Sequence, residues 1–129
     1  MKLLVDNNLP PRMARGLAAL FVGEHHVEHI KDKFGTGSLK DEEWIAKLAE
    51  EGKWAFLSGD IQIARKRPSR ESVLRSNLIG FFPMPSILRR PFEEQVIRIL
   101  KAWPDMGRVA TATERGVYEI TMNSRLRQI

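Results

Sequence analysis

The sequence contains no cysteine, which excludes disulfide bonds, a thiolate nucleophile and a thiolate zinc site. It also lacks long hydrophobic runs: the run at residues 17–22 falls far short of the roughly 20 residues that span a bilayer. The first apolar stretch, residues 1–5, reaches Asp6 too early for a signal peptide. We therefore expect a cytoplasmic protein that has no membrane partner.

Low-complexity and collagen-like segments are absent as well. Glycine and proline occur 9 and 7 times, and hydrophobic residues make up 43% of the chain, which are ordinary values for a globular protein. The length of 129 residues fits one domain. We expect a single domain over residues 1–129, with a core at about 1–103 and a C-terminal hairpin extension at about 104–129.

Acidic residues are scarce in one segment of a chain whose net charge is +5. Residues 61–90 contain seven basic residues and a single acidic one, Glu71, whereas the rest of the chain is close to charge balance. A local basic patch is typical of a polyanion partner, although a solvated surface or a patch for an acidic protein would have the same composition. We expect nucleic acid to be bound here by Arg65, Lys66, Arg67, Arg70 and Arg75.

Apolar runs alternate with helical patterns along the chain. Strands are predicted at residues 3–5, 27–30, 54–57, 78–82 and 117–122, with a final strand at 125–129 that closes a hairpin. Helices are predicted near residues 10–22, 39–51, 70–77 and 91–103, and Ser38 and Asp41 form a candidate capping box for the second helix. This order indicates an α/β fold with a mostly parallel sheet and a C-terminal β-hairpin.

Acidic residues follow two of the predicted strands. Asp6 comes directly after the first strand and Asp60 just after the third. Ligands of parallel sheets bind beyond the carboxyl ends of the strands, so both side chains would project into one crevice if these strands are near neighbours. Each aspartate taken alone could also be an ordinary turn residue.

A third acid could come from the start of the predicted helix at 39–51. Asp41 lies on the apolar stripe of this helix, Glu42 on its small-residue flank and Glu43 on the solvent side. Asp41 and Glu42 could also simply complement the helix dipole. Carboxylates that converge without an organic base suit a hard cation such as Mg²⁺ or Mn²⁺, and we predict Asp41 or Glu42, but not Glu43, as the third ligand.

Histidine and tryptophan residues offer weaker signals. Three histidines lie within residues 24–29, but their spacing on a strand matches no zinc pattern, so we expect a solvated strand edge. Trp44, Trp54 and Trp103 lie in apolar patterns, which favour core packing over base stacking.

Three stretches, at residues 3–10, 37–46 and 54–60, resemble the PIN (PilT N-terminus) domain superfamily, in particular its short members near VapC-type toxins. The first contains the strand that leads to Asp6, the second the acidic helix start, and the third the Ser58-Gly59-Asp60 turn. The resemblance extends over about residues 2–90 and implies a three-layer α/β/α sandwich. It further implies a metal-dependent endoribonuclease in which Asp6, Asp60 and either Asp41 or Glu42 hold Mg²⁺ or Mn²⁺.

The sequence departs from this superfamily in one place. Many PIN nucleases have a further aspartate a few residues beyond the Asp60 position, and here no acid occurs before Glu71. This departure favours the alternative of a degenerate PIN-like module that binds nucleic acid or a protein without cleaving, whereas the retained acids favour the enzyme. Toxin relatives imply RNA as the substrate and an acidic antitoxin protein as a partner, and they allow a homodimer.

Overall fold

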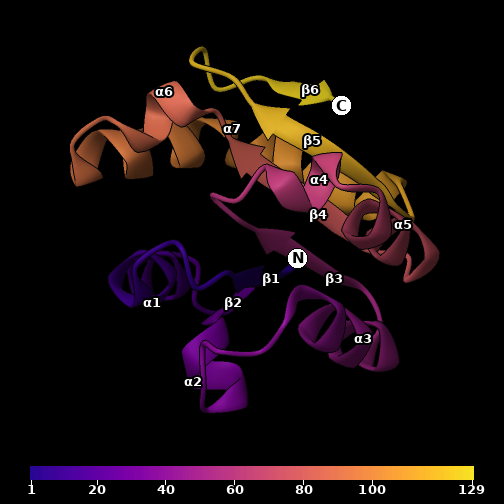
Figure 1. Ribbon diagram of the computed structural model, residues 1–129. Helices are drawn as coiled ribbons and strands as arrows, with labels where there is room; N and C mark the ends of the chain where they lie inside the picture. The colour runs from indigo at the N-terminus through magenta and orange to yellow at the C-terminus, as the bar shows by residue number, and fades with distance from the viewer.

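Six strands form one sheet in the computed structural model, which describes all of residues 1–129 (Figure 1). They are β1 (Lys2–Val5), β2 (His26–His29), β3 (Trp54–Leu57), β4 (Ile79–Pro83), β5 (Gly116–Ile120) and β6 (Leu126–Gln128). Their order is β2-β1-β3-β4-β5-β6, with parallel pairing from β2 to β5 and an antiparallel β5–β6 pair. The predicted α/β class, the mostly parallel sheet and the C-terminal hairpin are confirmed.

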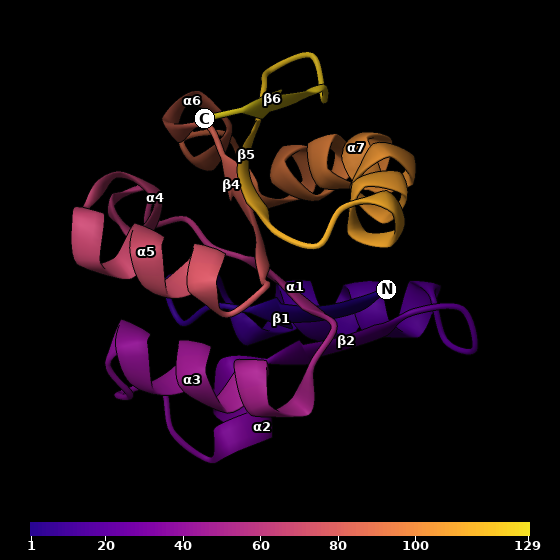
Figure 2. The ribbon, with the colours of Figure 1, turned by 90° about the vertical axis from the view of Figure 1, so that its right-hand side faces the viewer.

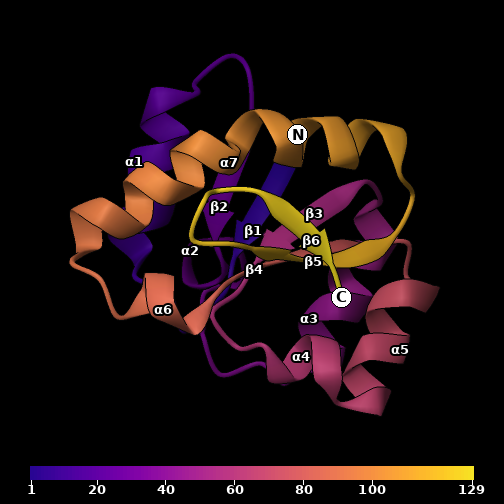
Figure 3. The ribbon, with the colours of Figure 1, turned by 90° about the horizontal axis from the view of Figure 1, so that it is seen from above.

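Helices cover both faces of this sheet. They are α1 (Pro11–Leu20), α2 (Ile30–Phe34), α3 (Asp41–Glu51), α4 (Gln62–Arg65), α5 (Arg67–Arg75), α6 (Pro85–Leu88) and α7 (Phe92–Ala112). Figure 2 shows α5 and α7 on opposite sides of β4 and β5, and the view from above in Figure 3 shows α7 as one long helix that crosses the molecule. None of these helices is both long and apolar enough to cross a membrane.

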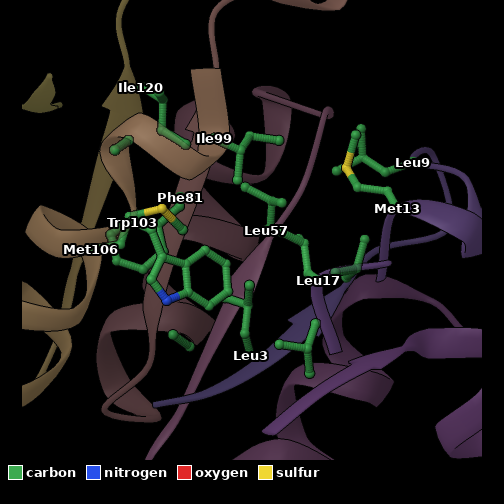
Figure 4. Close-up of a cluster of buried hydrophobic side chains, with 14 of the residues drawn as sticks. Leu3, Leu9, Met13, Leu17, Leu57, Phe81, Ile99, Trp103, Met106 and Ile120 are labelled. Atoms are coloured by element: carbon green, nitrogen blue, oxygen red, sulfur yellow. The ribbon is translucent and has the colours of Figure 1, made fainter. Parts of the chain in front are cut away.

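Alternation along the strands divides the core into two layers. Leu3 and Val5 of β1 pack with α1 and α7, whereas Leu4 packs on the other face with α3 and α5, because successive side chains of a strand point to opposite faces. Figure 4 shows part of the first layer, with labelled side chains that include Leu3, Leu17, Leu57, Phe81, Ile99, Trp103 and Met106. The predicted burial of Trp44, Trp54 and Trp103 is confirmed.

Two of the predicted helix ends are wrong. Ser38 does not cap α3, since its Oγ lies 2.6 Å from Thr36 Oγ1, and the Lys40 backbone N–H instead donates to Glu43 Oε1 at 3.4 Å. The prediction that the last helix stops at Trp103 also fails, because α7 runs through Pro104 to Ala112. A proline inside a helix removes one N–H donor and crowds the carbonyl four residues before it, but the buried stripe of α7 continues past Pro104 to Met106, so packing against the sheet holds the helix through this position.

The remaining differences concern short or shifted helices. Helices α2, α4 and α6 contain five, four and four residues, too few to show a helical period in the sequence. The helix predicted at 70–77 instead spans 67–75 as α5, with Pro68 in its first turn, where a proline costs no hydrogen bond.

Candidate metal centre

The backbone brings the two strand-end aspartates to neighbouring strands. Strands β1 and β3 pair in parallel with Val5 opposite Leu57, and the Asp6 backbone N–H donates to Leu57 O at 2.9 Å. Asp6 is 7% exposed, and Asp60 is partly buried in the turn after β3. The condition under which both aspartates share one crevice is therefore met.

Ser58 connects these two aspartates. Its hydroxyl donates to Asp6 Oδ2 at 2.8 Å and accepts the backbone N–H of Asp60 at 3.0 Å. The side chain is fully buried, so the hydroxyl orientation is fixed by these two partners. Because the donated proton points at Asp6, this arrangement favours the ionised form of that carboxyl group.

Asn8 holds the same turn from the other side and was not singled out in the sequence. Its Oδ1 accepts the Gly59 backbone N–H at 2.9 Å, and its Nδ2 donates to Ser58 Oγ at 3.4 Å. Asn8 thus links the loop after β1 to the loop after β3. The only signal for it in the sequence is its place two residues after Asp6, where turn asparagines are common in any protein.

The three acids at the start of α3 differ in exposure, and Glu43 is exposed, as the helical spacing predicts. Asp41 is partly buried and its Oδ1 accepts the indole N–H of Trp44 at 3.2 Å. Glu42 and Glu43 are both exposed. Glu43 is turned to the backbone of Lys40, while Glu42 remains close enough for its charge to act on Asp41.

Burial and neighbouring carboxylates raise the pKa values of Asp6 and Asp41. Burial raises the pKa of Asp6, and the charge of Asp60 raises it further, against the hydrogen bonds from Asn7 and Ser58 and the nearby His29. Burial also raises the pKa of Asp41, and the charges of Asp6, Asp60 and Glu42 add to that effect. Three carboxyl groups from separate loops therefore share one electrostatic environment, in which a bound cation would lower the cost of their ionisation.

His29 lies beside this cluster and corrects one expectation. It is fully buried rather than part of a solvated edge, since its Nε2 lies 2.7 Å from Leu9 O and its Nδ1 accepts the Lys31 backbone N–H at 3.2 Å. Both ring nitrogens are occupied by the backbone, which leaves no lone pair for a metal. His29 therefore packs beneath the loop after β1 and holds it through Leu9 O.

The oxygen donors suit a hard cation, although the side chains as placed form no group of three or more that could hold a metal ion. Each carboxylate is turned to a hydrogen-bond donor: Asp6 to Ser58, Asp60 to the Gln62 backbone N–H at 3.0 Å, and Asp41 to Trp44. The hydrogen bonds of Asp41 and Asp60 engage only their Oδ1 atoms, which leaves Oδ2 of each without a donor from the protein. Carboxylate oxygens of this kind fit Mg²⁺ or Mn²⁺, which keep several waters when they bind.

The predicted basic residues fall into two groups. Arg65, Lys66, Arg67 and Arg75 are exposed, and Arg67 pairs with Glu71 at 2.9 Å. Arg70 differs, because its guanidinium donates to Ala64 O at 3.0 Å and to Ile129 O at 2.9 Å. Arg70 thus joins the α4–α5 region to the end of the chain.

Comparison with known proteins gives one match. A family model described as a PIN like domain matches residues 1–84, a range that includes the loops after β1 and β3 and the start of α3. Searches of curated proteins and of solved structures found no match. The matched range covers well over half of the chain and every acid described above, and the chain therefore belongs to the PIN-like domain family.

Proposed function

We propose that this protein is a metal-dependent endoribonuclease that hydrolyses RNA phosphodiester bonds. The observation that carries the proposal is the connection of Asp6 to Asp60 through Ser58, with Asp41 close enough to be affected by both charges. In this proposal Asp6, Asp60 and Asp41 hold Mg²⁺ or Mn²⁺. Glu42 remains the alternative to Asp41, because it starts the same helix and its charge acts on Asp41.

The three carboxylates would hold the cation from positions that differ in burial. Asp6 supplies a buried carboxylate that Ser58 and the Asn7 backbone hold in place. Asp60 and Asp41 supply carboxylates from more accessible positions. When bound there, a divalent cation would polarise the scissile phosphate and make water a better nucleophile near neutral pH.

RNA is the proposed substrate because cationic side chains follow the acids directly. Arg65 and Lys66 lie at the end of α4, which begins two residues after Asp60, and neither forms an ion pair within the chain. Unpaired arginine and lysine side chains beside a cation site suit a phosphate backbone. We further propose that the protein acts in the cytoplasm as the toxin of a toxin–antitoxin pair, whose acidic antitoxin would compete for these side chains.

A second candidate is a PIN-like module that binds nucleic acid or a protein partner without cleaving it. Two observations favour it: no acid follows Asp60 before Glu71, which instead pairs with Arg67, and no three side chains as placed form a metal site. The two candidates differ in one property, since only the enzyme needs a divalent cation.

RNA cleavage assays distinguish the candidates. Purified protein is incubated with mixed RNAs in Mn²⁺, in Mg²⁺ or in EDTA, alongside Asp6→Asn and a matched control, Glu114→Gln, at an exposed site before β5. We expect cleavage in the presence of either metal by the parent and by the control, and none by Asp6→Asn or in EDTA. RNA binding without cleavage under all conditions would favour the non-catalytic module.

A further inference from the structure

A second group of arginines borders the acids from segments that lie partly outside the family match. Strand β4 neighbours β3 in the sheet, and α6 begins two residues after β4 ends at Pro83. A Cβ atom on Gly59 would lie 3.1 Å from Leu88 Cδ1, so the end of α6 packs against the turn that carries Asp60. The residues that follow Leu88 are Arg89 and Arg90, both exposed.

The turn that carries these arginines is held in place by one side chain. The Gln95 amide group donates to Leu88 O at 3.2 Å and to Arg90 O at 2.9 Å. Arg90 also lies 3.7 Å from Glu94 in an exposed pair, which contributes little in water. Arg89 has no carboxylate partner, and its charge is therefore available to a ligand.

Arg12 extends this group from the first turn of α1. Its guanidinium carbon lies 3.9 Å from the centre of the Phe92 ring, in the cation–π arrangement that orients a guanidinium. A stacked guanidinium keeps its in-plane N–H groups free, which is the geometry that binds phosphate oxygens in pairs. Because α1 follows Asp6 and Phe92 follows Arg90, the stack lies between the loop after β1 and the turn after α6.

The two arginine groups lie on different faces of the sheet. Ile63 of α4 belongs to the core layer of α3 and α5, whereas Ile87 of α6 belongs to the layer of α1 and α7. We call Arg65, Lys66 and Arg67 the α4 rim, and Arg12, Arg89 and Arg90 the α6 rim. The acids that follow β1 and β3 lie between the rims.

We propose that the α6 rim binds the phosphates of a single-stranded RNA on the side of the scissile phosphate opposite to the α4 rim, so that the strand crosses the carboxyl edge of the sheet. This inference rests on the proposed ribonuclease function. RNA fits better than an acidic peptide, because a single strand carries one phosphate at every nucleotide and can place phosphates on both rims with the scissile phosphate at the acids. That phosphate could share the divalent cation of the proposed function.

Binding measurements test the α6 rim. The triple variant Arg12→Gln, Arg89→Gln, Arg90→Gln is compared with a control of equal charge change, Lys47→Gln, Lys53→Gln, Arg115→Gln, whose exposed cations lie away from the acids. Fluorescence anisotropy follows a labelled oligouridylate in EDTA, where it is not cleaved, at several salt concentrations. Each lost phosphate contact lowers the slope of log K against log salt by about 0.7, so we expect the slope of the α6-rim triple variant to fall by about 2, and that of the control to stay unchanged.

The outcomes separate this inference from the proposed function. If the parent cleaves RNA and the α6-rim triple variant binds it with the parent's slope and affinity, the α6 rim is not part of the path, while the ribonuclease proposal stands. If the parent neither binds nor cleaves RNA, both proposals fail. If the variant loses binding only of a labelled oligoglutamate, the rim serves an acidic protein. Arg89→Gln alone disturbs no contact of the fold and should still lower the slope by about 0.7, which guards against misfolding of the triple variant.

Discussion

The two ends of the parallel strands differ in shape and in charge. At the amino end, a cavity of about 700 Å³ is lined by residues such as Lys2, Lys53 and Trp54. Its Lys2 ammonium donates to Gly52 O at 2.8 Å and lies over the Trp54 ring. At the carboxyl end, burial and neighbouring carboxylates raise the pKa values of Asp6 and Asp41.

This difference shows that a sizeable cavity and the strongest electrostatic signal need not coincide. The Lys2 ammonium at the amino end already has a hydrogen-bond acceptor within the chain, so its charge does not require a ligand. The carboxylates of Asp6 and Asp41 lie close to other acids at a cost in free energy, which a bound cation would reduce. Shifted pKa values of this kind are typical of functional sites. We therefore propose the carboxyl end as the place of the chemistry, although the cavity at the amino end taken alone would favour that end.

The largest expected difference between the two ends concerns Mn²⁺. At about 100 times its Kd, Mn²⁺ should stabilise the parent by about 2.7 kcal/mol and raise its melting temperature by several degrees. Asp6→Asn and Asp60→Asn should abolish this increase, whereas Lys53→Gln and Glu114→Gln at the amino end should keep it. Differential scanning fluorimetry measures the effect, and an unchanged increase in both aspartate variants would make the cluster purely structural.

Variants of the three acids at the start of α3 test which of them binds the metal. We expect Asp41→Asn to weaken Mn²⁺ binding by at least about 10–100-fold, the cost of losing even an outer partner of a metal site. Glu42→Gln should have a smaller effect because this side chain is exposed, and Glu43→Gln should have almost none. Isothermal titration calorimetry gives the three values. A loss for Glu43→Gln that exceeds both others would mean that the face assigned to Asp41 is wrong.

The basic residues next to Asp60 should differ in role, some contributing to RNA binding and one to the stability of the fold. Replacing Arg65, Lys66 and Arg67 with Gln should lower the salt slope of RNA binding by about 0.7 for each lost contact and leave the melting temperature nearly unchanged. Arg70→Gln should instead lower stability by about 1–3 kcal/mol, because two carbonyl oxygens lose a charged donor. Filter binding and urea unfolding measure the two effects, and equal behaviour of both variants would contradict this division.

The smallest expected effect is a pH dependence of stability that arises from Asp6. Its pKa lies above the ordinary 3.8 in the folded protein, so the folded state keeps a proton that the unfolded chain has already lost. The free energy of unfolding therefore falls as pH rises from the unfolded to the folded pKa. In EDTA, the melting temperature of Asp6→Asn minus that of the parent should increase between about pH 4 and pH 7. A difference that stays flat or decreases would contradict the raised pKa.

The positions of Asp6 and Asp60 could be predicted from the sequence because they depend on local patterns. Each follows a short apolar run that reads as a buried strand, and the edge of a parallel sheet then brings the strand ends together. The exposure of Glu43 likewise follows from helical spacing alone. These features require no knowledge of residues distant in the chain.

The features that could not be predicted depend on such distant residues. His29 is buried because Leu9 O accepts its ring N–H, and Arg70 is engaged because the chain end at Ile129 reaches it. Asn8 gains its role only when Gly59, which is 51 residues away, lies beside it. Spacing along a sequence contains no information about such partners until the fold brings them together.

Paramagnetic broadening of backbone amide signals by Mn²⁺ tests most directly the claim that the carboxyl end is the metal site. Substoichiometric Mn²⁺ is titrated into the parent and into Asp6→Asn, and the amide signals of Asn7, Asn8 and Gly59 are compared with those of Gly52 and Lys53. We expect selective loss of the first three signals in the parent and no selective loss in the variant. Selective broadening at Gly52 and Lys53, or equal broadening in both proteins, would contradict the account.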